Sequence, residues 1–301
     1  MSAAGQIGAS PKKTRGPARA TLELRDCILD ILADGDDETS WTVRQLYYAV
    51  TVVGGVPKTE GGYRRVQRQV LEMRRAGLID YRVIADNTRW VRRAPVYDTL
   101  ADWVDESLRK LRIDLWRDAD ERVECWIEKD ALAGVLVSVT ARWHVPLYVT
   151  RGYASETFAY EAASNAVNDG RRFRIIYLGD FDSSGVQMAR DLERRLRGFL
   201  ADDEPLLTFD RIAVTPKQID DWSLPSRPNK TTDTRHAAFA REFPGYEATE
   251  LDAIRPERLR ELVEGEILSM IEPEQVRSIR REEADARILA ETITRRMRGR
   301  S

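Results

Sequence analysis

The apolar positions follow a helical period in the first third of the chain. Spacings of three and four residues predict three helices, over 21–33, 42–53 and 63–76. Thr42 and Gln45 have the spacing of a capping box at the start of the second helix, and Gly77 ends the third. Two β-prone segments rich in arginine follow, at 78–84 and 88–91. Three helices followed by a basic hairpin predict a winged-helix domain.

After residue 120 short apolar runs alternate with helical segments. The runs predict strands over 123–127, 146–150, 173–178 and 206–214, and the segments between them predict helices over 131–142, 155–167 and 186–200. This alternation is typical of an α/β domain in which helices cover both faces of a parallel sheet. Residues 97–118 read as a helical linker, 225–235 as a polar connector, and 259–270 and 276–297 as amphipathic helices.

We therefore predict five segments. A disordered basic tail (1–19) precedes a winged-helix DNA-binding domain (20–95) and a helical linker (96–120). A metal-binding α/β domain (121–254) and a C-terminal helical extension (255–301) follow. The composition, with 42% hydrophobic and 33% charged residues, is that of a globular protein. Because the sequence contains no apolar run long enough to span a bilayer, we expect a cytoplasmic, nucleoid-associated protein. Two cysteines and two histidines argue against a disulfide framework, a structural zinc site and histidine-based catalysis.

The net charge of −2 conceals a basic N-terminal region. Residues 41–95 contain eleven Lys or Arg against four Asp or Glu, and the tail adds four basic residues. This distribution predicts a polyanionic partner, and the helix order makes double-stranded DNA the expected one. The candidate DNA-binding residues are Arg64, Arg65, Arg68, Arg75, Arg89, Arg92 and Arg93.

Two carboxylates stand one residue apart where an apolar strand ends. In the segment Gly179–Gly185, Asp180 and Asp182 point the same way if the strand period continues. Glu128 ends another predicted strand, and the carboxyl ends of parallel strands share one edge. Three carboxylates at one edge predict a Mg²⁺ site. The competing interpretation is that the Asp and Ser side chains cap the following helix.

The second helix contains two adjacent tyrosines with different surroundings. Tyr47 shares an apolar stripe with Val43 and Val50, which predicts a core position. Tyr48 lies one turn from Arg44, whose guanidinium is placed to stabilise a phenolate or a phosphate. On a DNA-binding helix, packing or a phosphate contact is the simpler role for such a tyrosine.

Together these motifs resemble the A subunit of topoisomerase VI and the related meiotic double-strand-break transesterase, over about residues 21–214. The family joins a winged helix with an R-x-x-Y-Y-like motif to a toprim domain, a Rossmann-like parallel sheet. The resemblance implies Tyr48 as the nucleophile, Arg44 and Lys129 as catalytic neighbours, and Glu128, Asp180 and Asp182 as Mg²⁺ ligands. Residues 250–253 are similar to an E-x-x-A element found late in that family.

The chain also departs from the family pattern. Ser183 stands where the family usually has Pro after D-x-D, and only about 20 residues precede the winged helix, where the A subunit has a longer segment that engages its ATPase partner. No Walker loop occurs in the sequence, so ATP-driven strand passage would need a separate B-type ATPase chain. Whether such a partner docks is left open.

The expected function is Mg²⁺-dependent DNA cleavage, in which Tyr48 attacks a phosphodiester and releases a 3′ hydroxyl. The resemblance implies a homodimer in which the tyrosine of one protomer works with the metal site of the other. Two alternatives stay open: a toprim nuclease that activates water, and a non-catalytic winged-helix DNA-binding protein.

Overall fold

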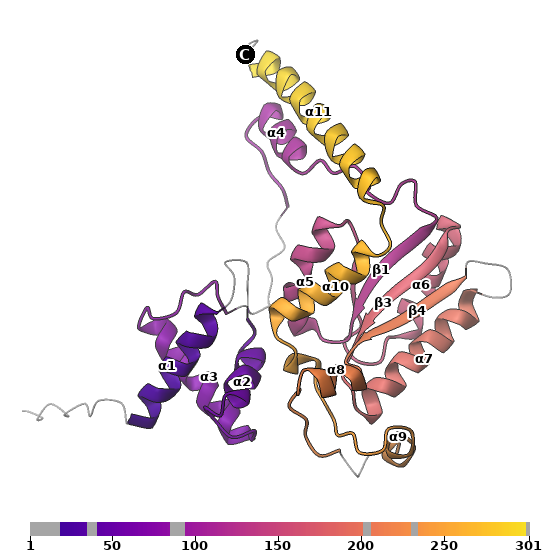
Figure 1. Cartoon of the computed structure of the whole chain (residues 1–301). Coiled ribbons are helices and arrows are strands. Elements are labelled where there is room, and N and C mark those ends of the chain that lie inside the picture. The colour runs from indigo at the N-terminus through magenta and orange to yellow at the C-terminus, as the bar shows by residue number, and fades with distance from the viewer. Residues whose placement is uncertain (1–18, 35–40, 85–93, 201–205, 230–233, 299–301) are drawn as a thin grey trace, which may run out of the picture.

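The computed structural model describes residues 19–34, 41–84, 94–200, 206–229 and 234–298 (Figure 1). It shows an α/β protein in which a four-stranded, all-parallel sheet is interleaved with helices, preceded by N-terminal helices and followed by C-terminal ones. The tail predicted over 1–19 lies outside the described residues except for Arg19, the first residue of α1.

The three N-terminal helices pack around a core of their own. They are α1 (Arg19–Ala33), α2 (Val43–Val52) and α3 (Glu60–Arg75). Ile28, Leu46, Val66 and Met73 are buried in this core, as their helical spacing predicts. The capping box of α2 is confirmed, because the Thr42 hydroxyl accepts the Gln45 N–H at 3.1 Å and the Gln45 side chain accepts the Thr42 N–H at 2.9 Å.

The prediction of a first hairpin strand over 78–84 is wrong. Instead of extending, the chain turns after Gly77, where φ is +72°, and Asp80 accepts the Arg82 N–H in an Asx turn. Only Ile84 forms a bridge, and it pairs with Trp41 rather than with a following strand. Local side-chain bonding therefore overrides the β propensity of this segment. The second expected strand, 88–91, lies outside the described residues.

The four predicted strands are confirmed within a few residues at their ends. In the sheet they stand in the order β2-β1-β3-β4, with the bounds β1 (Glu121–Ile127), β2 (Leu147–Val149), β3 (Arg172–Leu178) and β4 (Leu207–Ala213). The strand that follows β1 in the sequence, β2, lies at one edge of the sheet, and the strand that follows β3, β4, lies at the opposite edge. A crevice at the carboxyl ends of β1 and β3 is the position where such sheets bind ligands.

Alternate residues of each strand face opposite layers of helices. Cys125 and Ile127 contribute to the core shared with α5 (Asp130–Arg142) and α10 (Pro256–Leu268). Trp126 contributes to the core shared with α6 (Glu156–Asp169) and α7 (Ser183–Leu200). Helices thus cover both faces of the sheet, as predicted (Figure 1).

The remaining helices extend the fold beyond the sheet. The linker is helical only over α4 (Leu100–Arg109), which packs on α11 (Pro273–Arg298) in the arm at the top of Figure 1. The buried Glu283 of α11 fixes this arm by accepting the Ile113 N–H at 2.9 Å. Three short helices were not predicted: α8 (Pro216–Asp221), α9 (His236–Glu242) and the 3-10 turn η1 (Leu251–Ala253). No helix in the described part of the chain could cross a membrane.

Candidate active site

Glu128 and Asp180 meet in the crevice between β1 and β3. Glu128 directly follows β1, and its N–H is held by the Leu178 carbonyl at 2.9 Å. Its carboxylate accepts the Asp180 N–H at 3.1 Å. The intervening Gly179 is needed for this approach, because a Cβ there would lie 2.9 Å from a Glu128 carboxylate oxygen. Two of the three predicted carboxylates are therefore adjacent and buried.

Glu128 and Asp180 are two buried acids that repel each other when both are charged, which favours a positive group between them. Burial, and then the negative charge of Asp180, raise the pKa of Glu128 to about 7. Burial also raises the pKa of Asp180. A divalent cation with oxygen ligands would relieve this repulsion, so the donor chemistry of the pair fits Mg²⁺.

Asp182 has a different partner from the other two carboxylates. One of its oxygens accepts the Gly185 N–H at 2.8 Å, within the first turn of α7. This is the helix-capping role that the sequence left open. Among the residues that the structure describes, no group of three or more His, Cys, Asp or Glu side chains is arranged to hold a metal ion. The three-carboxylate Mg²⁺ site stays a prediction.

Lys129 places its ammonium group among the acids of the crevice. Its Nζ lies 3.0 Å from Asp180 Oδ1, 2.5 Å from Asp252 Oδ2 and 3.2 Å from Glu250 Oε2. Burial alone would lower the pKa of Lys129, but the charges of Asp252, Asp180 and Glu250 raise it. The side chain is therefore a permanent cation at the edge of the sheet.

The segment that contains Glu250 is fixed beside the D-x-D loop by backbone pairing. Thr249 and Phe181 exchange two N–H to carbonyl hydrogen bonds, of 2.8 and 2.9 Å. Ala248 and Arg227 exchange two more, of 3.0 and 2.8 Å. The Leu251 N–H then donates to Asp180 Oδ1 at 2.8 Å. These contacts fix the position of Glu250 at the mouth of the crevice.

Glu250 forms ion pairs with cations from three parts of the chain. Arg44 of α2 donates to both carboxylate oxygens, at 2.8 and 2.9 Å, and Arg227 lies 2.9 Å from Oε1. Lys129 is the third cation. Although burial opposes it, the charge of Lys129 and the hydrogen bond from Arg44 lower the pKa of Glu250 to about 2. The predicted catalytic arginine thus joins the N-terminal helices to the edge of the sheet.

Tyr48 lies beside this cluster and is only 4% exposed. Burial and the Glu250 charge raise the pKa of its phenol, against the lowering effect of Arg44 and Lys129. The ring lines a cavity of about 300 Å³ together with Lys58, whose Nζ lies 5.3 Å from the ring centroid. Burial lowers the pKa of Lys58 to about 8. Tyr47 is a core residue, as predicted, and its hydroxyl donates to the Thr59 carbonyl at 3.2 Å.

An open cleft of about 600 Å³ brings most of the predicted site residues together. Its lining includes Arg44, Glu128, Lys129 and Asp180, together with the unpredicted Arg227, Glu250 and Asp252. The Tyr48 cavity adjoins this cleft, because Arg44, Arg227 and Glu250 line both. In the sequence, Arg227 falls in the polar connector 225–235 and Glu250 begins the short E-x-x-A-like motif. Only their proximity to the crevice, which a sequence pattern cannot show, gives them a role.

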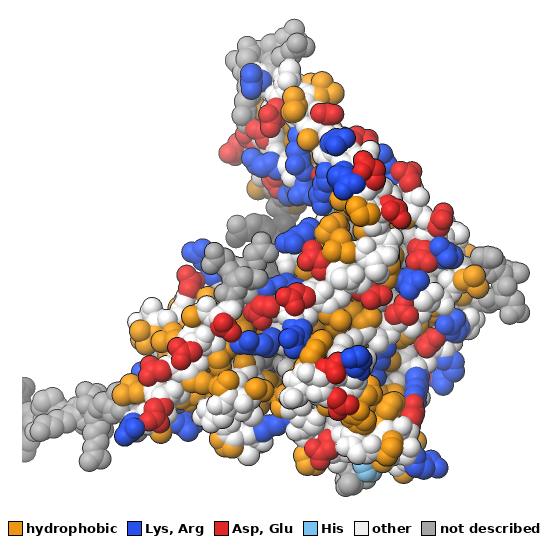
Figure 2. All heavy atoms as spheres, in the orientation of Figure 1, with side chains coloured by type: hydrophobic (Ala, Val, Ile, Leu, Met, Phe, Trp, Pro, Cys, Tyr) orange, Lys and Arg blue, Asp and Glu red, His pale blue; other side chains and the backbone are white. Residues whose placement is uncertain are grey.

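The predicted DNA-binding arginines of α3 are on its surface, and some are already paired. Arg64 lies 2.5 Å from Glu60, and Arg65 donates to the Ala20 carbonyl at 2.6 Å. Arg68 and Arg75 are exposed. Figure 2 shows basic and acidic side chains intermixed on the face it presents. Three other predicted contacts lie outside the described residues, namely Arg89, Arg92 and Arg93.

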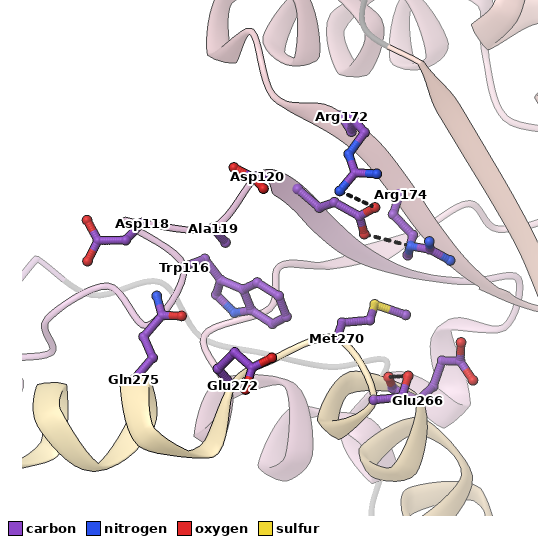
Figure 3. Close-up of a pocket in the computed structure, with 12 residues that line it drawn as sticks. Trp116, Asp118, Ala119, Asp120, Arg172, Arg174, Glu266, Met270, Glu272 and Gln275 are labelled. Carbon is purple, nitrogen blue, oxygen red and sulfur yellow. Dashed lines mark hydrogen bonds and ion pairs between the residues drawn. The ribbon is translucent and has the colours of Figure 1, made fainter.

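A second large pocket lies at the opposite end of the strands (Figure 3). It is lined by the amino-terminal ends of β1 and β3 and by the start of α11, with Trp116 on one wall. Its two arginines, Arg172 and Arg174, both pair with Glu121, at 3.3 and 2.9 Å. Since these cations are neutralised and the carboxyl ends of the strands are remote, this pocket is not part of the candidate site.

At one sheet edge, two adjoining cavities are therefore lined by a buried tyrosine and by a mixture of cations and acids, among them Arg44, Lys129, Arg227, Glu128, Asp180, Glu250 and Asp252. No protein-family model matches the sequence, and a search of curated proteins found no match.

Proposed function

We propose that this chain is a DNA-cleaving transesterase, built like the A subunit of topoisomerase VI from a DNA-binding domain, here the three N-terminal helices, and a toprim domain. The observation that carries the proposal is the position of α2, whose Arg44 binds Glu250 at the sheet edge that bears Glu128 and Asp180. This places Tyr48, one turn further along α2, next to groups suited to binding a phosphate.

In the proposed reaction the Tyr48 oxygen attacks a phosphorus atom of the DNA backbone. A bond forms between this oxygen and the phosphorus, the bond from the phosphorus to the 3′ oxygen breaks, and the tyrosine becomes linked to the 5′ phosphate. The phenol loses its proton and the 3′ oxygen gains one, so the products are a phosphotyrosyl link and a 3′ hydroxyl. Because one phosphodiester replaces another, the reverse reaction reseals the strand without ATP.

The cations of the site supply the electrostatic part of this chemistry. A buried phenol with a raised pKa is a poor nucleophile unless positive groups stabilise the charge that forms on it and on the phosphate. Arg44, Lys129 and Arg227 meet within one cleft, and all three now contact Glu250. A DNA phosphate would compete with this carboxylate for them. Mg²⁺ held by Glu128 and Asp180, with Asp182 close by, would add further positive charge.

One observation favours a second candidate function. Tyr48 is almost fully buried, whereas the acids of the crevice line an open cleft. A toprim nuclease, in which metal-activated water attacks and Tyr48 only packs, would be consistent with this difference. Both functions take double-stranded DNA as the partner, and cutting both strands by the first would require two copies of the chain.

Covalent trapping on supercoiled plasmid with Mg²⁺ distinguishes the candidates. We expect the wild type and the Tyr47→Phe control to remain bound to DNA ends after denaturation, and Tyr48→Phe to lose at least about 100-fold of this adduct, since a phenyl ring has no nucleophile. If Tyr48→Phe still cuts and no protein is trapped, the protein is a nuclease. If no variant cuts but all bind, it is a DNA-binding protein.

A further inference from the structure

The cavity beside Tyr48 contains a cation that is not paired with an acid. Lys58 is half-buried in the loop between α2 and α3, and its Nζ lies 5.3 Å from the centre of the Tyr48 ring. Both side chains line the cavity of about 300 Å³. In the described part of the chain, no Asp or Glu oxygen comes within ion-pair distance of Lys58. Its ammonium group therefore lies between an aromatic ring and the cavity.

The other cations near Tyr48 are bound to a carboxylate. Arg44 and Arg227, which line the same cavity, lie 2.8 and 2.9 Å from Glu250, and Lys129 lies 3.2 Å from it. A phosphate that approaches any of these three must compete with the Glu250 carboxylate. An anion that approaches Lys58 meets no such competition, and a charge-assisted contact to its ammonium group is available without breaking an ion pair.

The backbone around Lys58 is held in place by the N-terminal helices themselves. Before it, the Gly55 N–H donates to a carbonyl of α2 at 2.9 Å. After it, the Tyr47 hydroxyl donates to the Thr59 carbonyl at 3.2 Å. Lys58 and Tyr48 thus belong to one packed unit, and their proximity does not depend on how these helices meet the sheet.

The charge state of Lys58 suits anion binding near neutral pH. Burial lowers its pKa to about 8; the charge of Arg227 acts in the same direction, while the charges of Glu250 and Glu247 oppose it. The group is still mostly protonated at pH 7, and a bound phosphate would raise its pKa again. The other charged or titratable side chains that line the cavity are Arg44, Glu60, Tyr47, Tyr48 and Tyr63.

We propose that Lys58 binds the DNA phosphate that enters this cavity, with its ammonium group on a non-bridging oxygen. The inference rests on the proposed function, in which this phosphate is the one that Tyr48 attacks. The cavity combines the cation with the rings of Tyr48 and Tyr63, and charge beside aromatic surface suits a nucleotide unit. In this position the cation also stabilises the negative charge that develops on the phosphate during the attack.

DNA binding in EDTA tests this contact while cleavage is prevented. A short labelled duplex is titrated with each protein at several salt concentrations. Lys58→Met keeps the stem that packs on the tyrosine ring but loses the charge, so we expect an affinity about 10-fold lower and a salt dependence shallower by about one phosphate contact. Lys58→Arg should restore both. Lys110→Gln is the control, because Lys110 is exposed on the arm and pairs with Glu106; it should bind as the wild type does.

Three results of this series would overturn the inference. The first is wild-type affinity and salt dependence in Lys58→Met, and the second is a loss that Lys58→Arg does not restore. The third concerns pH: wild-type affinity should fall above pH 8 as the lysine loses its proton, whereas Lys58→Arg should keep its affinity, so parallel profiles would contradict the contact. Urea unfolding controls for misfolding, since removing a half-buried unpaired charge should not lower the midpoint of Lys58→Met.

Covalent trapping with Mg²⁺ at saturating DNA separates this inference from the proposed function. If the phosphate held by Lys58 is the one attacked, Lys58→Met should form the adduct about 10-fold more slowly even when all of the protein is bound. An unchanged rate at saturation would place the contact on another phosphate and overturn the inference. A wild-type protein that forms no adduct would overturn the proposed function instead, and the binding series alone would then decide whether Lys58 holds a phosphate.

Discussion

Glu250 is the residue on which the charges of the site depend. Its buried carboxylate forms ion pairs with Arg44, Lys129 and Arg227, so three cations that would otherwise repel one another share one anion. A buried charge of this kind stabilises the fold only while its partners are charged and in place. The low pKa of Glu250, about 2, expresses this dependence.

The depressed pKa of Glu250 predicts a stability that acid removes. Because the folded pKa lies below the ordinary value of 4.5, the contribution is complete above pH 4.5 and is lost as the pH falls towards 2. A shift of this size corresponds to about 3 kcal/mol. We expect Glu250→Gln to lower the free energy of unfolding by about this amount at pH 7, and the difference from wild type to shrink between pH 4.5 and pH 2.5.

Urea unfolding at a series of pH values measures this difference. Glu274→Gln is the matched control, because Glu274 is largely exposed and pairs with Arg277 of its own helix. The control should stay within about 0.5 kcal/mol of wild type at every pH. A Glu250→Gln difference that did not change with pH would mean that packing, and not charge, accounts for the role of Glu250.

At the scale of elements, the junction between β3 and α7 decides the geometry of the acids. The chain leaves β3 at Gly179, and α7 begins three residues after Asp180. Arg211 of β4 donates to the Asp180 carbonyl, and its guanidinium lies 5.7 Å from the centre of the Phe181 ring. Gly185 approaches the same carbonyl so closely that an added Cβ would lie 2.2 Å from it.

Gly185→Ala is expected to damage this junction, although alanine normally favours helices. The clash is with backbone, which cannot move aside as a flexible side chain can, so we predict a loss of at least about 2 kcal/mol of stability. Gly198→Ala on the same helix is the control, because a Cβ there meets nothing within 4 Å. It should raise stability by about 0.5–1 kcal/mol. Thermal unfolding of both variants tests the prediction, which fails if Gly185→Ala melts with the wild type.

The elements themselves were largely predictable from the sequence, whereas their contacts were not. The four strands and the helices between them follow from periodicity, because each element buries one face or one stripe. The prediction of a strand over 78–84 failed because the Asp80 side chain accepts a hydrogen bond from the backbone N–H of Arg82 and holds this β-prone segment in a turn. Glu128, Asp180 and Arg44 were found through strand ends and helical spacing. Glu250 gains its role from pairing between segments almost 70 residues apart, and no local pattern encodes that.

At the scale of the whole molecule, the core of the N-terminal helices meets the sheet domain, with its two cores, at a junction that contains ion pairs. The core of the N-terminal helices and the cores around the sheet are separate. Between α2 and the stretch from Trp222 to Pro225 a cavity of about 110 Å³ remains, so apolar packing across the junction is incomplete. The ion pairs of Arg44 and Arg255 therefore carry much of the attachment.

The final prediction is that Arg44→Gln loosens this junction while the N-terminal helices and the sheet domain both stay folded. Glu250 keeps Lys129 and Arg227, so it remains charged, but α2 loses two hydrogen bonds to a carboxylate, a loss of about 2 kcal/mol. We expect faster amide hydrogen exchange in η1 and a larger radius of gyration by solution X-ray scattering, with the exchange of β1 and β3 unchanged. Arg255→Gln should change both readouts less, because its partner Asp34 is largely exposed and screened. If Arg44→Gln matched the wild type in exchange and scattering, apolar contacts would have to hold the N-terminal helices, and α2 would stay at the sheet edge without its arginine.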